Sequence, residues 1–543
     1  MAWKPSMPDL QPRTWFTVGN LVAGVSVGAY LIPQAMAYGS LAGVGPAMGL
    51  ATAIVPLLVY AALGSHIWMS VGPESAVAMM AAAAVAPVGL AVGMEPAALL
   101  PTMAVIVGIA LIVGRFLKAS FLADLLSLPV LVGYLTGIAI LMVMSQIYRL
   151  TGIDADTTDI RTLFTNTDWH APNWATLGVG LIVAAVAWGA PKISPRFPGA
   201  LLALGLSIVL GYLVDIPTIG PVTSAMPTFG VPTLSMDVVS ALLWPAISVA
   251  AVAFADVTVT GRAITDGTRP NTKREMLAIG GSQLATGFFS GYPVSASSSR
   301  TALARASGAT SRHYSLVVAV VIILAPLLLG GVLSRIPQAG LAGIILFAAI
   351  SLLEPAQWRK LARLHKNETL IAASCTVVVL VFGILPGIAF AIGMSVIAFL
   401  ARLARPTASV LGFTPMSASM HSVDTHDDTD TVPGLVVFRY EAPLFFINAP
   451  DFFDEAMDVV DPETDVLLIN MEASANLDVT SLDTLAELND TLRQRGVDMW
   501  LARVRYDVME LMEKHGVLED IGREHVYETL TIAVDAFRTA DMH

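Results

Sequence analysis

The stretch GYPVSASSSRTALARASG, Gly291–Gly308, places a proline, several serines and an arginine inside a long apolar region of the chain. A helix that crosses a membrane needs about 20 apolar residues, whereas the helix predicted here, 295–308, is short and begins with polar residues. Pro293 precedes it, and a proline interrupts the hydrogen bonding of a continuous helix. The stretch therefore predicts a half-helix that starts inside the membrane rather than at its surface.

The composition of the whole chain agrees with a membrane protein. Of its 543 residues, 55% are hydrophobic and only 13% are charged, whereas a soluble domain carries about a quarter charged residues. Residues 1–415 hold 22 Lys+Arg and 15 Asp+Glu, a balance of +7, while residues 416–543 hold 8 and 27, a balance of −19. These balances predict a polytopic α-helical membrane domain followed by an acidic soluble domain.

About fourteen apolar segments can be counted in the membrane part of the chain. They start near residues 17, 46, 72, 97, 121, 171, 197, 239, 275, 295, 313, 336, 367 and 386. The segments 72–90 and 295–308, whose starts are marked by Pro73 and Pro293, take the same place in two halves of seven. An odd number of segments per half gives the halves opposite orientations. Short, interrupted segments in matching places of two halves indicate the binding site of a transporter.

The basic residues of the loops predict the orientation of these segments. If the N-terminus is cytoplasmic, 18 Lys and Arg lie on the cytoplasmic side and only Arg149, Arg161 and Arg335 lie outside, which is the asymmetry of the positive-inside rule. We therefore expect a multi-pass protein of the plasma (inner) membrane whose two termini are cytoplasmic. Its parts are an N-terminal segment (1–16), a transmembrane domain (17–405), a linker (406–432) and an α/β domain (433–543).

The start of the predicted half-helix at 295–308 has the chemistry of an anion site. A helix N-terminus exposes unpaired backbone N–H groups and a partial positive charge. Ser297, Ser298 and Ser299 add hydroxyl donors, and Arg300 adds a fixed positive charge. Two structural alternatives remain open: the serines can cap the helix and allow close packing, and Arg300 can pair with a buried carboxylate, Glu74 or Asp256.

Those two carboxylates are the acidic residues that fall well inside predicted segments. Asp256 has Thr260 one helical turn later on the same face, so the two side chains can hold Na⁺ or exchange a proton; the alternative is a structural ion pair. Glu74 is followed by Ser75 at the start of segment 72–90. There a carboxylate can cap the helix or gate the site, or it can contact the substrate.

Several function classes find no support in the sequence. We find no phosphate-binding glycine loop, hydrolytic triad, zinc motif or basic nucleic-acid patch. We therefore expect neither an enzyme nor a nucleic-acid binder, and no organic cofactor or structural metal.

Three motifs resemble the SulP (sulfate permease) family of anion transporters. The first segment, GVSVGAYLIPQAMAYGSLAGVGPAMGL, is similar to the signature of that family. SVGPESAV resembles the start of its third segment, and GYPVSASSSRTALARASGATS resembles its tenth. NLDVTSLDTLAEL is similar to the Asp-x-Ser/Thr motif of STAS domains. The resemblance covers nearly the whole chain.

The resemblance implies a seven-plus-seven inverted repeat with UraA-like core and gate domains, a homodimer, and elevator-type alternating access. It also implies an anion bound between the third and tenth segments. Carried onto this chain, the substrate site comprises Gln34, Tyr38, Glu74, Ser75, Ser297, Ser298, Ser299 and Arg300, and the cation-coupling residues are Asp256 and Thr260. Asp at position 256, where many members have Glu, favours Na⁺, and a proton stays open as the coupling ion.

In the STAS domain, Thr480 takes the position that is phosphorylated in antagonist proteins of this type. A phosphate there would add about −1.5 to −2 charges at a helix start. The alternative is that Asp478 and Thr480 cap a helix beginning near Ser481.

We therefore expect secondary active transport of a small anion, namely sulfate, bicarbonate or a dicarboxylate such as fumarate, coupled to Na⁺ or H⁺. Two alternatives share the fold: an uncoupled exchanger or channel, and a transceptor that signals through a cytoplasmic partner of the STAS domain. The sequence leaves the anion open, since helix dipoles, hydroxyls and an arginine suit all three.

Overall fold

The computed structural model describes residues 15–117, 127–153, 171–193, 199–222, 226–264, 271–413, 420–423 and 429–540. The chain divides into two compact units, which we call the membrane unit (Met1–Ser395) and the C-terminal unit (Val396–His543). Of the predicted N-terminal segment, 1–16, all but the last two residues lie outside the described ranges.

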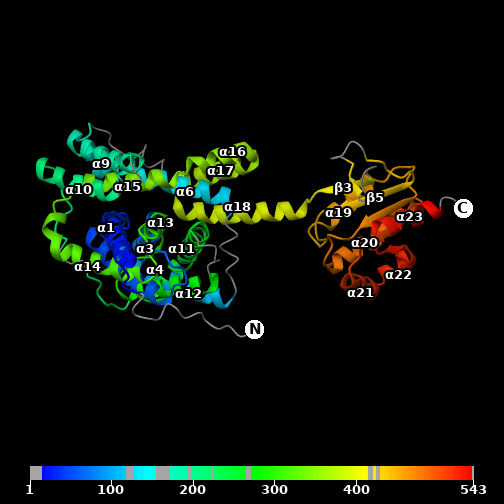
Figure 1. Cartoon of the computed structure of the whole chain (residues 1–543), viewed down its shortest axis with the longest axis horizontal. Coiled ribbons are helices and arrows are strands. Elements are labelled where there is room, and N and C mark those ends of the chain that lie inside the picture. The colour runs from blue at the N-terminus through cyan, green and yellow to red at the C-terminus, as the bar shows by residue number, and fades with distance from the viewer. Residues whose placement is uncertain are drawn as a thin grey trace. The chain divides into compact units, whose positions relative to one another are not determined.

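The membrane unit is helical (Figure 1), and a helix begins within three residues of thirteen of the fourteen predicted starts. The remaining start, near 121, lies outside the described residues, and the next described helix begins at Leu128. The helices of its first half are α1 (Val18–Leu41), α2 (Pro46–Leu63), α3 (Ser75–Val92), α4 (Pro96–Phe116), α6 (Leu128–Met144), the short α7 (Ile147–Thr151), α9 (Trp174–Ile193) and α10 (Gly199–Leu213). Those of its second half are α11 (Met236–Ala263), α12 (Thr272–Phe288), α13 (Ser298–Ala306), α14 (Tyr314–Leu333), α15 (Gln338–Leu352), α16 (Pro355–Leu364), α17 (Lys366–Phe382) and α18 (Ile384–Ala404).

Not all of these helices are long. Among the described residues, ten helical stretches are long and apolar enough to cross a membrane, and the other predicted segments are the shorter helices α10, α12, α13 and α17. The two predicted half-helices also differ, because α13 has 9 residues whereas α3 has 18. The difference follows from the alanine-rich sequence after Ser75, which favours a longer helix.

Helices of the first half of the membrane unit make contacts that the helices in the matching places of the second half also make. Helix α1 packs against α14 as α11 packs against α4, and α3 packs against α11 as α13 packs against α1. In the same way, α2 with α14 matches α12 with α4, and α6 with α17 matches α15 with α9. Such paired contacts are what two structural repeats of seven helices produce.

The helices form two groups that are visible in Figure 1. We call α1–α4 and α11–α14 the core group, and α6, α7, α9 and α10 with α15–α18 the gate group. The two groups meet where α1 contacts α10 and α15, and where α3 contacts α6 and α15.

The extended segments before α3 and α13 lie next to each other. β1 (Val71–Gly72) pairs with β2 (Ser295–Ala296) in antiparallel fashion, so the two helices start from one short ladder. The amide of Ser297 donates to the Ser70 carbonyl at 3.1 Å. On α12, the Gln283 amide group donates to the Val294 carbonyl at 2.7 Å and accepts from the Val294 N–H at 3.1 Å. Non-helical backbone inside a membrane needs such internal partners.

The C-terminal unit contains a six-stranded sheet in the order β4-β3-β5-β6-β7-β8. Its strands are β3 (Ala408–Phe413), β4 (Met420–Ser422), β5 (Leu435–Tyr440), β6 (Val466–Asn470), β7 (Asp498–Ala502) and β8 (Val526–Tyr527). Strands β5 to β8 run parallel, whereas β3 is antiparallel to both β4 and β5.

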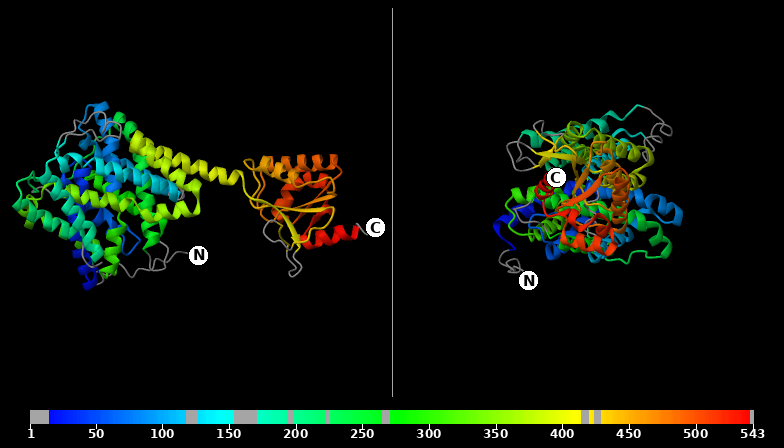
Figure 2. Two further views of the ribbon diagram at one scale, coloured as in Figure 1. Left: turned by 90° about the horizontal axis from the view of Figure 1, so that it is seen from above. Right: turned by 90° about the vertical axis from the view of Figure 1, so that its right-hand side faces the viewer.

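Helices cover both faces of this sheet (Figure 2). The helices of the unit are α19 (Ala449–Asp458), α20 (Val479–Gln494), α21 (Tyr506–His515), α22 (Val517–Ile521) and α23 (Leu530–Ala540). Buried residues of α19 to α22 share one apolar cluster with the sheet, while α23 joins a second cluster around Trp500. This arrangement is the predicted α/β domain.

The sequence assigned residues 406–432 to a linker, and the structure corrects this boundary. Residues 408–413 form β3, which pairs with β5 from Ala408↔Tyr440 to Leu411↔Val437, and residues 420–422 form β4. The sequence indicates a linker here because the hydropathy falls sharply after Arg405. Its strand character comes from pairing with β5, which is a tertiary contact.

Candidate functional site

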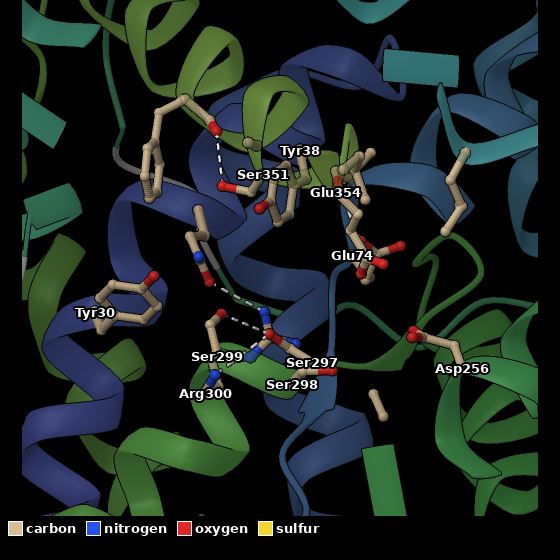
Figure 3. A pocket seen from close by; sticks show the side chains of 17 residues that line it. Tyr30, Tyr38, Glu74, Asp256, Ser297, Ser298, Ser299, Arg300, Ser351 and Glu354 are labelled. Atoms are coloured by element: carbon tan, nitrogen blue, oxygen red, sulfur yellow. Dashed lines mark hydrogen bonds between the residues drawn. The ribbon is translucent and has the colours of Figure 1, made fainter. Parts of the chain in front are cut away.

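A cavity of about 250 Å³ lies where the core group meets the gate group. All eight residues of the predicted substrate site line it, together with Asp256. The full lining is Tyr30, Gln34, Tyr38, Glu74, Ser75, Leu135, Asp256, Ala296, Ser297, Ser298, Ser299, Arg300, Phe347, Ala348, Ser351, Leu352 and Glu354 (Figure 3).

The N-terminus of α13 supplies hydroxyl groups to the cavity. Ser297 is the N-cap, and its hydroxyl accepts from the Arg300 amide at 3.4 Å and lies 3.2 Å from the Ser299 hydroxyl. Ser298 and Ser299 are exposed, whereas Ser297 and Arg300 on either side of them are buried. The capping alternative therefore applies to Ser297, whereas Ser298 and Ser299 present free surface to the cavity.

Arg300 is fully buried and joins three segments of the core group. Its Nη1 donates to the Pro73 carbonyl at 3.0 Å and to Gln34 Oε1 at 3.2 Å, and its Nε donates to Ser70 Oγ at 3.2 Å. Its Nη2 has no hydrogen-bond partner among the described residues. No described carboxylate lies within 4 Å of this guanidinium, so the alternative of an ion pair with Glu74 or Asp256 is not realised.

The N-terminus of α3 is arranged differently, because a carboxylate of the chain already occupies it. Glu74 is the N-cap, and its Oε2 accepts from the amides of Ala76 at 2.8 Å and Val77 at 3.1 Å. Its Oε1 accepts from the Ser75 hydroxyl at 2.8 Å. Glu74 thus caps α3, which is one of the alternatives that the sequence left open, and it also lines the cavity. Its contact with the substrate stays a prediction.

Asp256 and Thr260 of α11 contact the segment that leads into α13. Asp256 Oδ2 accepts from the Ser295 hydroxyl at 2.9 Å, and Thr260 Oγ1 lies 2.7 Å from Ser298 Oγ. Asp256 lines the cavity, while Thr260 is fully buried behind it. The predicted pair on one face of α11 is therefore placed beside the start of α13.

The gate group forms the opposite wall, which the sequence reasoning missed. Leu135 of α6 and Phe347, Ala348 and Leu352 of α15 make it mostly apolar. Ser351 and Glu354 add two polar groups from the end of α15 (Figure 3). Glu354 was hidden in the sequence because it stands between an apolar segment and a basic one, where a carboxylate reads as part of a loop.

Glu275 is a further acid of the membrane unit, at the start of a predicted segment rather than well inside one, and it is more buried than Glu74 and Asp256. Glu275 of α12 is 3% exposed. It accepts from the Tyr60 hydroxyl at 2.8 Å, the Ser65 amide at 2.8 Å and the His66 amide at 3.1 Å. The sequence placed it at the very start of a segment, next to Lys273 and Arg274. Its partners satisfy it fully, so its role is to hold the loop after α2.

The charges of the cavity wall are unbalanced. Glu74, Asp256 and Glu354 are three carboxylates, and Arg300 is the single guanidinium. Donors for an anion come from the α13 end, while carboxylate oxygens for a cation come from α3, α11 and the end of α15. Among the described residues, no group of three or more His, Cys, Asp or Glu is placed to hold a metal ion.

In the C-terminal unit, Asp478 caps α20 and Thr480 does not. The Asp478 carboxylate accepts from the Ser481 amide at 2.9 Å, the Ser481 hydroxyl at 2.7 Å and the Phe446 amide at 2.8 Å. Although desolvation acts to raise it, these hydrogen bonds hold the pKa of Asp478 below its usual range. The helix begins at Val479, so Thr480 lies in its first turn with an exposed side chain.

Known proteins resemble this chain over almost its full length. The sequence profile of the Sulfate permease family matches residues 18–375, and that of the STAS domain matches residues 427–533. A probable sulfate transporter of Mycobacterium tuberculosis (strain CDC 1551 / Oshkosh) is 37% identical, over 99% of this chain and 98% of that protein. Sulfate transporter 4.1, chloroplastic, of Arabidopsis thaliana is 25% identical, over 95% of this chain and 79% of that protein.

Two solved structures share the fold. The murine Solute Carrier 26 family member A9 anion transporter in the inward-facing state gives a TM-score of 0.82 at 21% identity, covering 97% of this chain and 92% of that one. The transmembrane domain of the cyanobacterial bicarbonate transporter BicA gives 0.60 at 20% identity, covering 68% and 96%. The fold is that of a helical membrane transporter, and the relatives are transporters rather than enzymes. The chain therefore belongs to the sulfate permease family of anion transporters and carries a STAS domain.

Proposed function

We propose that this protein is a secondary active transporter that takes up a small anion through the cavity between its core and gate groups. The observation that carries the proposal is Arg300: a buried guanidinium without a carboxylate partner, at a helix N-terminus that lines a cavity. A buried charge without a partner is costly. A bound anion at the α13 end would compensate the positive field of Arg300 and receive hydrogen bonds from Ser298, Ser299 and the first amides of α13.

Sulfate is the first candidate for this anion, with bicarbonate and a dicarboxylate such as fumarate as alternatives. The sulfate assignment draws on the name of the M. tuberculosis relative, which matches this chain from end to end. The chemistry of the site agrees with it, since a tetrahedral oxyanion presents several acceptors to hydroxyl and amide donors.

The charges of the cavity wall support our proposal that transport is coupled to a cation. With three carboxylates and one guanidinium, an added anion meets a net negative field unless a proton or Na⁺ enters with it. We assign this role to Asp256, because it lines the cavity and its contact to Ser295 links it to the segment that starts α13.

An elevator-type movement is supported by the division of polar and apolar residues between the two walls. The residues assigned to the anion all belong to the core group, from α1 to the start of α13, whereas the gate wall is mostly apolar. A core group that holds its substrate can therefore move along the gate group without breaking polar contacts to it.

We further propose that the protein acts as a homodimer in the plasma membrane with both termini in the cytoplasm.

The test is uptake by purified protein in liposomes of labelled sulfate, bicarbonate and fumarate, each with and without Na⁺ and pH gradients. We expect accumulation of sulfate above equilibrium that requires one of the gradients. Uptake that merely equilibrates under every gradient would identify an uncoupled exchanger or channel. Removal of residues 416–543 that leaves uptake unchanged but abolishes a cellular response would identify a transceptor.

A further inference from the structure

Helix α16 carries a basic face that the anion cavity does not use. Ala356, Arg359, Lys360 and Arg363 follow the i, i+3, i+4, i+7 spacing that places side chains on one face of a helix. With Leu364 they line an open hollow of about 430 Å³. The three cations are thus presented together rather than scattered around the helix.

The opposite face of α16 is fixed to the membrane unit. Trp358 Nε1 donates to Thr136 Oγ1 of α6 at 2.9 Å. Leu361 is buried in a small cluster with Val132 of α6 and Ala372 of α17. Because these contacts prevent the helix from rotating about its axis, its basic face points away from α6 and α17.

The three cations of α16 have no acidic partner among the described residues. Arg359 Nε donates to the Pro355 carbonyl of its own helix at 3.3 Å, and no carboxylate of a described residue lies within 4 Å of Arg359, Lys360 or Arg363. In the C-terminal unit, by contrast, four arginines are paired with carboxylates, in Arg439–Glu441, Arg503–Glu472, Arg505–Asp507 and Arg523–Glu513. The α16 cations are therefore left for a partner outside the membrane unit.

The position of α16 indicates what that partner is. The helix connects α15 to α17, two apolar helices, and the chain breaks from α15 at Glu354, whose φ of 40° is left-handed. Charged side chains avoid the hydrocarbon interior, so exposed cations at this connection lie at the level of the lipid headgroups. Leu364, which lines the hollow with them, is 63% exposed, and Leu370 of α17 is 71% exposed. Such exposed leucines suit contact with acyl chains.

We propose that the basic face of α16 binds the phosphate groups of anionic phospholipids, with Leu364 and Leu370 against their acyl chains. Basic amphipathic helices bind anionic bilayer surfaces through this combination of charge and apolar area. The acidic C-terminal unit is a second partner of opposite charge. The two exposed leucines favour lipid as the partner, because acyl chains offer them an apolar environment and an acidic protein surface does not.

The test is hydrogen–deuterium exchange of the full chain in nanodiscs of phosphatidylcholine alone and of phosphatidylcholine with phosphatidylglycerol. We expect the amides of α16 to exchange at least ten-fold more slowly with phosphatidylglycerol, since each basic residue near an anionic surface contributes roughly a five-fold preference. The variant Arg359→Gln/Lys360→Gln/Arg363→Gln should lose this difference. The matched control Arg439→Gln/Arg505→Gln/Arg523→Gln removes the same charge from exposed ion pairs and should keep it.

Two outcomes would overturn the proposal. The first is equal exchange of α16 in both lipid compositions in the wild type, a result that does not depend on any variant folding. The second is protection of α16 without phosphatidylglycerol, accompanied by protection of an acidic segment of the C-terminal unit, with both lost in the charge variant. That second result would assign the basic face to the C-terminal unit.

Discussion

The two half-helix starts, α3 and α13, begin from one β-ladder but end up with opposite chemistry. At α3, the Glu74 carboxylate accepts from the first amides, so an anionic group of the chain already fills that N-terminus. At α13, the cap is the neutral Ser297 hydroxyl, two exposed serines face the cavity, and Arg300 is buried directly behind.

This difference indicates that the anion site is one-sided, by which we mean that its donors come from the start of α13 and not from the start of α3. An external anion can use the donors of α13 without displacing anything. At α3 it must compete with Glu74, or wait until that carboxylate is protonated or moves. We infer that α13 with Arg300 binds the anion, whereas α3 with Glu74 sets how strongly the cavity repels it.

Of the variants that test this difference between α13 and α3, Arg300→Ala should have the largest effect on sulfate uptake. Arg300→Ala deletes the fixed positive charge and leaves Gln34 and the Pro73 carbonyl without their donor. We expect sulfate uptake to fall by about 100-fold or more, since each hydrogen bond to a charged group is worth roughly 1.5–3 kcal/mol. Uptake in liposomes with matched protein amounts measures the effect.

Two further variants control that measurement. Arg300→Lys keeps the charge and should retain part of the uptake. Arg335→Ala removes an exposed arginine of the connection between α14 and α15 and should change little. A folded Arg300→Ala protein with wild-type uptake kinetics would remove Arg300 from the site.

Asp256→Asn should separate cation coupling from anion binding. The amide keeps an acceptor for the Ser295 hydroxyl but loses the negative charge that attracts a cation. We expect gradient-driven accumulation to fall by roughly ten-fold or more, while equilibrium exchange of labelled sulfate continues. Counterflow and gradient-driven uptake in the same liposomes measure the two processes. Concentrative uptake that survives in this variant would show that coupling does not use Asp256.

Glu74→Gln should strengthen anion binding. The neutral amide keeps an oxygen that can accept from the Ala76 and Val77 amides, but it no longer repels the substrate. We expect the dissociation constant for sulfate to fall on the order of ten-fold, as for the loss of one nearby like charge in a partly solvated site. Glu95→Gln is the matched control, because Glu95 precedes α4 at an N-cap without a side-chain cap bond. Weaker sulfate binding by Glu74→Gln would contradict this, because it would mean that the carboxylate supports sulfate binding.

In the C-terminal unit, Asp478 caps α20 with a carboxylate, as Glu74 caps α3 in the membrane unit. The smallest predicted effect is that of Asp478 removal on the stability of the C-terminal unit. Asp478→Ala should lower the unfolding free energy of the C-terminal unit by about 1 kcal/mol, the usual value of an N-cap. Because hydrogen bonds hold the pKa of folded Asp478 below its unfolded value of about 4, this contribution is complete above that value. It is lost as the pH falls through the folded pKa.

Denaturant unfolding followed across the acidic range measures this prediction. The wild type and the variant should differ near neutral pH and converge in acid. A difference that persists unchanged to low pH would show that the cap acts without the carboxylate charge.

The sequence predicted the main parts of the site because their signals are local. Pro73 and Pro293 mark the breaks before α3 and α13, and the spacing of Asp256 and Thr260 places both on one face of α11. Which chemistry each helix start has was not predictable, because the Glu74 cap competes with substrate contact for the same residue. The spacing alone cannot decide between them.

The parts that were missed depend on contacts between distant segments. Gln283 satisfies the backbone before α13, and Glu354 enters the cavity from the gate group, but neither stands out from its neighbours in the chain. Residues 408–413 became a strand only by pairing with β5, in a region whose composition reads as a linker.

Selenate, a sulfate analogue with an anomalous scatterer, tests the central claim most directly. In a structure of the full chain with selenate, we predict an anomalous peak in the cavity at hydrogen-bond distance, about 3 Å, from the Ser298 or Ser299 hydroxyls at the start of α13. Glu74 should still accept from the Ala76 and Val77 amides. A peak at the first turn of α3 with Glu74 displaced, or a peak outside the cavity, would contradict the one-sided site.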